Sequence, residues 1–191
     1  MNPRLKQMTL AGMLIALGVI IPMFSPIRVV LEPASFTLAS HVVIFIAMFI
    51  SPTMAVAVTL GTTFGFFMGG FPIVVVLRAF SHIVFAFGGA TYLKRLRSTD
   101  RSLSFIQLRI FSFVIGVVHA VCEVFVVTLF YMGGNLGQAF TERGFFVSVI
   151  LLVGVGTIVH SMVDLEIANV VMVALRKQKG MEALRTKTDT F

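Results

Sequence analysis

Residues 72–97 read PIVVVLRAFSHIVFAFGGATYLKRLR, and this stretch decides the class of the protein. From Pro72 to Leu93 it is apolar apart from Arg78, His82 and a few small polar residues. That length suffices to cross a bilayer, which takes roughly 20 residues in a helix. The stretch ends in the basic tract 94–97, of the kind that stays on the cytoplasmic side. We therefore predict a membrane-spanning helix that carries a cation within the bilayer.

The rest of the chain has the same character. Of its 191 residues 58% are hydrophobic and 12% are charged, and the mean hydropathy is +1.01. Soluble domains have about 25% charged residues. A chain this apolar could not cover its surface in water, so the lipid bilayer is its expected solvent. We predict one transmembrane domain, 1–191, which leaves no room for a soluble catalytic domain.

We predict an all-α integral membrane protein, a bundle of six transmembrane helices. Breakers such as Ser51-Pro52 and Gly69-Gly70 separate neighbouring spans. The first apolar run follows a basic start and resembles a signal peptide, but no clear cleavage site follows it, so we expect it to be retained. The expected spans are about 8–24, 36–50, 53–70, 72–93, 108–132 and 146–175.

The positions of the basic residues predict the topology. Twelve of the 15 lysines and arginines lie in the N-terminal tail, in segment 94–109 or in the C-terminal tail from Arg176. With six spans all three tracts fall on one side, so the positive-inside rule predicts that both termini are cytoplasmic (N-in, C-in). The net charge of +7 then reflects topology, and we expect no binding of nucleic acid.

Ionisable residues inside spans are costly, so they point to function. Arg78 and His82 lie one helical turn apart near the outer end of their span, and His41 and Glu123 are expected at similar depth. These four side chains could form one cavity in the outer half of the bundle. The planar guanidinium of Arg78 suits a carboxylate ligand. Alternatively, Arg78 pairs permanently with Glu123 and only holds two helices together.

A second pair, His160 and Asp164, lies one turn apart in the last span, and we favour structural pairing for it. Glu166 points elsewhere, about 200° around the helix from Asp164. The spacing is unspecific for a metal and the helical HExxH signature is absent, so we predict neither a metal site nor a cofactor. The lone Cys122 excludes an internal disulfide.

Small residues indicate helix contacts. Gly61, Gly65 and Gly69 recur at four-residue spacing, and we expect them to pack within the bundle. Ala11, Gly12 and Ala16 form a similar strip in the first span, and this pattern alone is weak evidence for a particular partner.

Motifs for catalysis are missing. The sequence has no GxxxxGK[ST] phosphate loop and no GxSxG nucleophile elbow, so we expect neither ATP hydrolysis by this chain nor another enzymatic activity. No internal repeat is obvious either, which argues against an inverted-repeat transporter.

Three blocks carry a family resemblance: 11–16 (AGMLIA), 33–41 (PASFTLASH) and 70–82 (GFPIVVVLRAFSH). With them the chain resembles the substrate-binding S components of energy-coupling factor (ECF) vitamin transporters, in the branch for nicotinate or pantothenate. The likeness covers nearly the whole chain in size, number of spans and basic tail. Gly12 departs mildly from the family, which more often has a pair of alanines in this strip.

The resemblance implies a high-affinity vitamin-binding subunit of an ATP-driven importer in a bacterial cell membrane. It implies a site near the outer face, a lid formed by the loop 25–36, and docking through Ala11, Gly12 and Ala16. The docking partner would be a membrane coupling protein, driven by two cytoplasmic ATPases.

The choice of vitamin stays open. Nicotinate would need an aromatic wall, for which the candidates are Phe36, Phe71 and Phe80. Pantothenate would need hydroxyl and amide partners, for which Asn135, Ser40 and Ser81 are available. The expected ligand-binding residues are Arg78, His82, His41, Glu123, Phe36 and Asn135.

A different class of function also fits some of these residues. A stand-alone secondary transporter of a small organic anion could be proton-coupled through His119, Glu123, His160 and Asp164.

Overall fold

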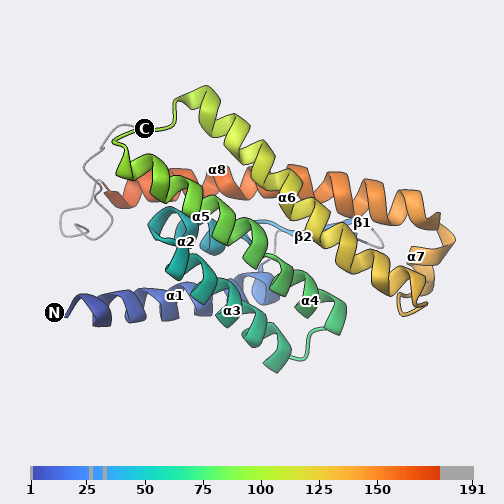
Figure 1. The fold of residues 1–191 in the computed structure, drawn as a ribbon. Coiled ribbons are helices and arrows are strands. Elements are labelled where there is room, and N and C mark those ends of the chain that lie inside the picture. Colours follow the sequence, from blue (N-terminus) through green and yellow to red (C-terminus); the bar gives the residue numbers. More distant parts are fainter. Residues whose placement is uncertain (1, 26–27, 32–33, 177–191) are drawn as a thin grey trace.

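The structure, a computed structural model, describes residues 2–25, 28–31 and 34–176, with side chains left out for Pro3, 28–31, 34–36, 139–140 and Arg176. It is a predominantly helical bundle (Figure 1). Within this part of the chain, four helical stretches are long and apolar enough to cross a membrane: Arg4–Phe24, Ile73–Ser98, Phe105–Met132 and Phe146–Leu175. A shorter apolar helix, α3 (Pro52–Met68), lies among them.

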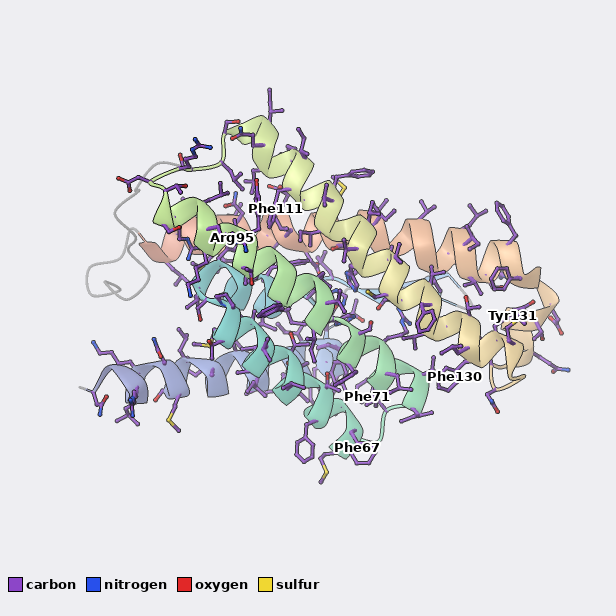
Figure 2. The ribbon with its side chains drawn as sticks, viewed as in Figure 1. Phe67, Phe71, Arg95, Phe111, Phe130 and Tyr131 are labelled. Atoms are coloured by element: carbon purple, nitrogen blue, oxygen red, sulfur yellow. The ribbon has the colours of Figure 1, made fainter. Side chains whose placement is uncertain are left out.

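Large apolar side chains cover much of the outside of the bundle. Phe67, Phe113 and Met132 are each more than half exposed, and Figure 2 shows Phe67 pointing away from the helices. In water such a surface would be unfavourable, whereas lipid tails solvate it. The predicted membrane class is therefore supported by the outside of the molecule as well as by helix length.

The segment predicted as the second span differs from the expectation. The chain leaves α1 (Pro3–Phe24) and forms two antiparallel strands, β1 (Arg28–Leu31) and β2 (Ala34–Thr37), before a turn and the short α2 (Val42–Ile50). The helix predicted for residues 36–41 is thus wrong, and the all-α class needs this hairpin added. A short apolar run does not distinguish strand from helix by hydropathy alone, and Ala39 at φ 67° has a left-handed backbone that a helix would not contain.

Helix α2 lies in the centre of the bundle and is stabilised at both ends by side chains from other helices. Its residues Val42–Phe49 are all buried. At its start, the Asp164 carboxylate accepts the backbone N–H groups of Ala39 at 2.8 Å and His41 at 2.9 Å. At its end, the guanidinium of Arg97 donates to the carbonyls of Phe49 and Ile50. An anion at the N-terminus and a cation at the C-terminus match the helix dipole.

The span predicted at 72–93 is a helix interrupted at one residue. Helix α4 (Ile73–Ser81) and helix α5 (Ile83–Ser98) meet at His82. Just before the break, the Ser81 hydroxyl donates to the carbonyl of Arg78 at 2.7 Å, a side-chain bond that competes with helical bonding and bends helices. Arg78 therefore lies within α4 and His82 at the junction with α5, and both side chains line the cavity described below.

The last two predicted spans agree closely with the structure. Helix α6 (Phe105–Met132) begins with a capping box of Ser104 and Gln107, a helix-start signal. After the short α7 (Gln138–Glu142), the chain forms a π-helical segment η1 (Phe146–Val155) that continues as α8 (Gly156–Arg176).

Glycines bring α1 and α3 into close contact. A Cβ atom added at Gly61 would lie 2.4 Å from the Ile15 side chain, and one at Gly65 would lie 2.3 Å from Val19. The predicted packing role is confirmed for these two residues. Gly69 has only the backbone of Gly65 and its own neighbour Phe71 close by.

The start of α1, the α5–α6 connection and the end of α8 lie at the same end of the bundle (left in Figure 1). These are the elements that carry or adjoin the basic tracts. The α3–α4 and α6–α7 connections lie at the opposite end.

Candidate ligand-binding site

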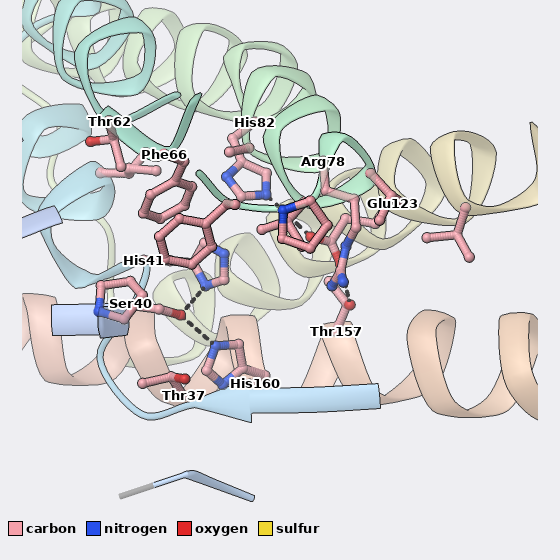
Figure 3. Close-up of a pocket in the computed structure, with 18 of the residues that line it drawn as sticks. Thr37, Ser40, His41, Thr62, Phe66, Arg78, His82, Glu123, Thr157 and His160 are labelled. Atoms are coloured by element: carbon pink, nitrogen blue, oxygen red, sulfur yellow. Dashed lines mark hydrogen bonds and ion pairs between the residues drawn. The ribbon is translucent and has the colours of Figure 1, made fainter. Parts of the chain in front are cut away.

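A cavity of about 340 Å³ lies inside the bundle and is open at one side. Its walls come from α1, β2, the turn 38–41, α2, α3, α4, α6 and α8 (Figure 3). This volume is at the lower end of the range of small-molecule sites. The polar side chains that line it are Thr37, Ser40, His41, Thr59, Thr62, Arg78, His82, Glu123, Thr157 and His160.

The carboxylate of Glu123 is the centre of the polar wall. Its Oε2 accepts hydrogen bonds from Arg78 Nη2 at 2.8 Å and from the Thr157 hydroxyl at 2.7 Å. Its Oε1 lies 3.2 Å from His82 Nε2 and 3.5 Å from His119 Nε2. Glu123 is 3% exposed, so these contacts replace water around a buried charge. They join α4, α6 and α8 at one point.

Arg78 keeps donor capacity beyond this pair. Its Nη2 bonds Glu123, but Nε is buried and has no hydrogen-bond partner among the described residues. The side chain is 23% exposed and lines the cavity. The predicted pairing of Arg78 with Glu123 is present, and the guanidinium can still receive an anion.

A second polar group joins the turn 38–41 to α8. Asp164, which is fully buried, lies with its Oδ2 3.3 Å from Nδ1 of His41 and from Nε2 of His160. The hydroxyl of Ser40 lies 3.2 Å from His41 Nδ1 and 3.0 Å from His160 Nε2. His160 and Asp164 thus pair with each other and with a neighbouring segment, as predicted; that their role is purely structural stays a prediction. Glu166 points elsewhere as expected, and pairs with Arg109.

One wall of the cavity is aromatic. The rings of Phe66 and Phe71 stack at 4.7 Å between centroids with 28° between their planes, and both line the cavity. Thr62, one turn before Phe66, lines it too, but its buried hydroxyl lies beside Gly18 of α1. The site thus combines a cation with a flat apolar surface.

The structure brings four of the predicted ligand-binding residues together: Arg78, His82, His41 and Glu123 all line the cavity. Asn135 does not line it, because it is exposed beyond the end of α6. The side chain of Phe36 lies outside the described part. Of the other aromatic candidates, Phe71 lines the cavity and Phe80 is 51% exposed. That any of them contacts a ligand stays a prediction.

Several lining residues were not predicted. They are Thr37, Thr59, Thr62, Phe66 and Thr157, together with His160, which was expected deeper and apart from the ligand. The sequence of α3 could have indicated its three residues, because Thr59, Thr62 and Phe66 recur at helical spacing within an apolar span and so share one face. For Thr157 no local pattern distinguishes it from other small polar residues in membrane helices.

The small-residue strip of α1 lies outside this site. Gly12 and Ala16 are exposed and Ala11 is half-buried, and a Cβ atom added at Gly12 would meet nothing within 4 Å. Within the described residues the strip therefore has free space in front of it. Its role in docking stays a prediction.

Comparison with known proteins gives one informative match. The chain is 40% identical, over 166 residues, to the niacin transporter NiaX of Lactococcus lactis subsp. cremoris (strain MG1363). The match covers 86% of this chain and 72% of that protein. No family model matches the chain, and no solved structure matches it.

Proposed function

The chain belongs to the family of the niacin transporter NiaX, the nicotinate-type S components, and we propose on this basis that it is the substrate-binding subunit of an ATP-driven vitamin importer. The proposed ligand is a small carboxylate vitamin bound in the cavity beside Arg78. We favour nicotinate, since the relative is named for niacin, and keep pantothenate as the alternative.

The observation that carries this proposal is the partly exposed guanidinium of Arg78 in the same cavity as the aromatic pair. A carboxylate would accept hydrogen bonds from the part of the Arg78 guanidinium that is exposed to the cavity. The pyridine ring would rest against Phe66 and Phe71, which are already stacked. His82, His41 and Glu123 would complete the site, and Phe36 remains a candidate from the hairpin.

For the topology we propose six crossings with both termini in the cytoplasm of a bacterial cell. Helix α2 has 9 residues, about 13 Å, which is half of a bilayer core. Strand β2 adds about 13 Å, because a strand rises roughly 3.3 Å per residue. Residues 34–50 would therefore reach from the cytoplasmic side to the outer face, with α2 and the turn 38–41 deeper in the bilayer and β2 at the outer face, where the hairpin lies. Irregular backbone is tolerated at that depth where protein covers it, and α2 is covered.

The cavity would then face the outside. Its lining includes Pro22 near the end of α1, Phe71 before α4 and Leu136 beyond α6, all toward the end opposite to the basic tracts. The hairpin formed by β1 and β2 would act as the lid, with Thr37 at its base. The strip of Ala11, Gly12 and Ala16, of which Gly12 and Ala16 are exposed, would dock onto a membrane coupling protein that two cytoplasmic ATPases drive.

The test is equilibrium binding of radiolabelled nicotinate to the purified chain. Arg78→Ala should weaken binding about 30-fold or more, since removing one partner of a buried charge pair costs about 2 kcal/mol or more. Arg109→Ala is the matched control, because Arg109 pairs with Glu166 outside the cavity. Equal affinity in wild type and Arg78→Ala would remove Arg78 from the site.

A proton-coupled secondary transporter remains the second candidate, because the described part holds a connected set of histidines and carboxylates. Uptake of the anion into liposomes by this chain alone, driven by a proton gradient, would support it. Uptake that requires ATP and partner subunits would support the S-component proposal.

A further inference from the structure

All four histidines of the chain gather at one place. The ring of His41 is at the centre, with centroid distances of 4.8 Å to His82, 4.7 Å to His119 and 5.1 Å to His160. Figure 3 shows three of them, His41, His82 and His160, converging from different elements. An anion site built on Arg78 does not require four imidazoles, so anion binding alone does not explain this cluster.

Three of these imidazoles and one carboxylate have the arrangement of a metal site. One nitrogen each of His41, His82 and His119 and one oxygen of Glu123 all lie within 4.8 Å of one another. In a tetrahedral site with bonds of about 2.0–2.1 Å, ligand atoms lie about 3.4 Å apart. The distances from Glu123 Oε1 to His82 Nε2 and His119 Nε2 are 3.2 Å and 3.5 Å. Two of the ligand pairs therefore already have the required spacing.

His119 supplies an independent observation. Its side chain is fully buried, with an exposed fraction of 0%, and neither ring nitrogen has a hydrogen-bond partner within the described residues. A buried imidazole without hydrogen bonds is unfavourable by itself. Coordination of a cation by Nε2, on the side of Glu123, would offset that cost.

The surroundings of His41 also fit a ligand. Its Nδ1 lies 3.3 Å from Asp164 Oδ2, and Asp164 is fixed by the backbone N–H groups of Ala39 and His41. A carboxylate on the far nitrogen of a histidine is the usual outer support of metal-binding imidazoles. The other acidic set, His41 with His160 and Asp164, is less suited, because the oxygens of Asp164 are already engaged and His160 contacts Ser40.

The balance of charge favours a divalent cation. If the imidazoles are neutral, this buried group has one positive charge, on Arg78, and two negative charges, on Glu123 and Asp164. A bound carboxylate would add a third negative charge. A divalent cation together with that carboxylate would make the buried group neutral, which is the least costly state inside a bilayer. This coupling rests on the proposed function, whereas the metal site itself does not.

We propose that His41, His82, His119 and Glu123 bind one divalent transition-metal ion, of the Zn²⁺ type, at the floor of the cavity. Imidazole nitrogens with a carboxylate oxygen are the ligand set that Zn²⁺ and Co²⁺ accept. Oε2 of Glu123 would continue to accept the hydrogen bonds of Arg78 and Thr157, and Oε1 would coordinate the metal.

The test uses the full chain, purified without a histidine tag, treated with chelator, and free of vitamin. Co²⁺ is titrated while the visible absorption of four-coordinate Co²⁺ is recorded, and Zn²⁺ is then added in competition. We expect one Co²⁺ per chain and its displacement by Zn²⁺. No stoichiometric binding, or a spectrum of six-coordinate aqueous type, would overturn the proposal.

Substitutions test which residues bind the metal ion. His119→Gln should lower Co²⁺ affinity at least about ten-fold, whereas Cys122→Ser, which removes the only thiol, should leave it unchanged. If His119→Gln fails to fold, judged by size-exclusion chromatography and circular dichroism, His82→Gln takes its place. Unchanged Co²⁺ binding in a folded ligand variant would overturn the assignment. Nicotinate binding to the chelated protein is measured in parallel, so loss of the metal proposal and loss of the vitamin proposal are distinguishable.

Discussion

At the scale of single residues, Glu123 determines how the helices meet around the cavity. It receives Arg78 from α4, His82 from the break between α4 and α5, and Thr157 from α8. A carboxylate this deeply buried is stable only with several donors. These contacts leave Arg78 partly exposed to the cavity, so in the proposed site one residue would serve both the packing of the helices and the binding of the ligand.

Thr157→Val should destabilise the protein, because valine has the shape of threonine but cannot donate to Glu123. The loss of a hydrogen bond to a buried charge costs about 1.5–3 kcal/mol, which lowers the melting temperature by roughly 5 °C for a chain of this size. Thermal unfolding in detergent, followed by circular dichroism, measures it. Thr141→Val is the control, since the Thr141 hydroxyl donates to the Gln138 carbonyl at an exposed site; equal melting temperatures in both variants would contradict this role.

The convergence of Arg78, His82, His41 and Glu123 could be predicted from the sequence, because span direction and helical spacing fix the depth of each residue. The contacts of Asp164 and Arg97 with α2 could not. Both residues lie far from α2 in sequence and act on its backbone groups, which no side-chain pattern reveals. The sequence also did not predict that His160 lines the cavity. Its contact Ser40 lies in a turn, whereas hydropathy predicted a helix there.

At the scale of elements, α2 is the unusual part of the fold. A helix of 9 residues is marginal without support, yet this one forms the centre of the core. Asp164 and Arg97 satisfy backbone groups at its two ends, and burial by its neighbours supplies the rest. Its N-terminal end carries His41 into the cavity, so the stability of α2 bears directly on the site.

Arg97→Met should loosen α2 by leaving the carbonyls of Phe49 and Ile50 without this donor. We expect a loss of about 2 kcal/mol, from hydrogen bonds to a charged group and from the dipole interaction. The melting temperature of the purified protein reports it. Arg95→Met, a neighbouring arginine whose side chain is exposed, is the control. A melting temperature equal to that of Arg95→Met would show that Arg97 does not support α2.

At the scale of the whole molecule, the end of the bundle toward which the cavity lies is opposite to the end that carries the basic tracts. Hydropathy predicted six spans. At these positions the described part of the structure has four long helical stretches, the shorter helix α3 and the half-length helix α2. The surface of α1 remains open, which suits a subunit that associates with others in the membrane.

Gly12→Trp and Ala16→Trp should therefore prevent co-purification with a membrane coupling protein while vitamin binding is retained. Gly88→Trp is the control, because Gly88 is also exposed on a helix with nothing within 4 Å of an added Cβ. Affinity purification of the chain from cells that express the ATPases and the coupling protein provides the measurement. Recovery of the partners with both α1 variants would place the docking surface elsewhere.

The central claim is that the cavity recognises a carboxylate through Arg78. Isothermal titration of the wild-type chain with nicotinate and with nicotinamide, which has the same ring without the charge, tests it most directly. We predict that nicotinate binds and that nicotinamide binds at least about 30-fold more weakly, a difference of about 2 kcal/mol. Equal affinity for the two compounds would contradict the claim.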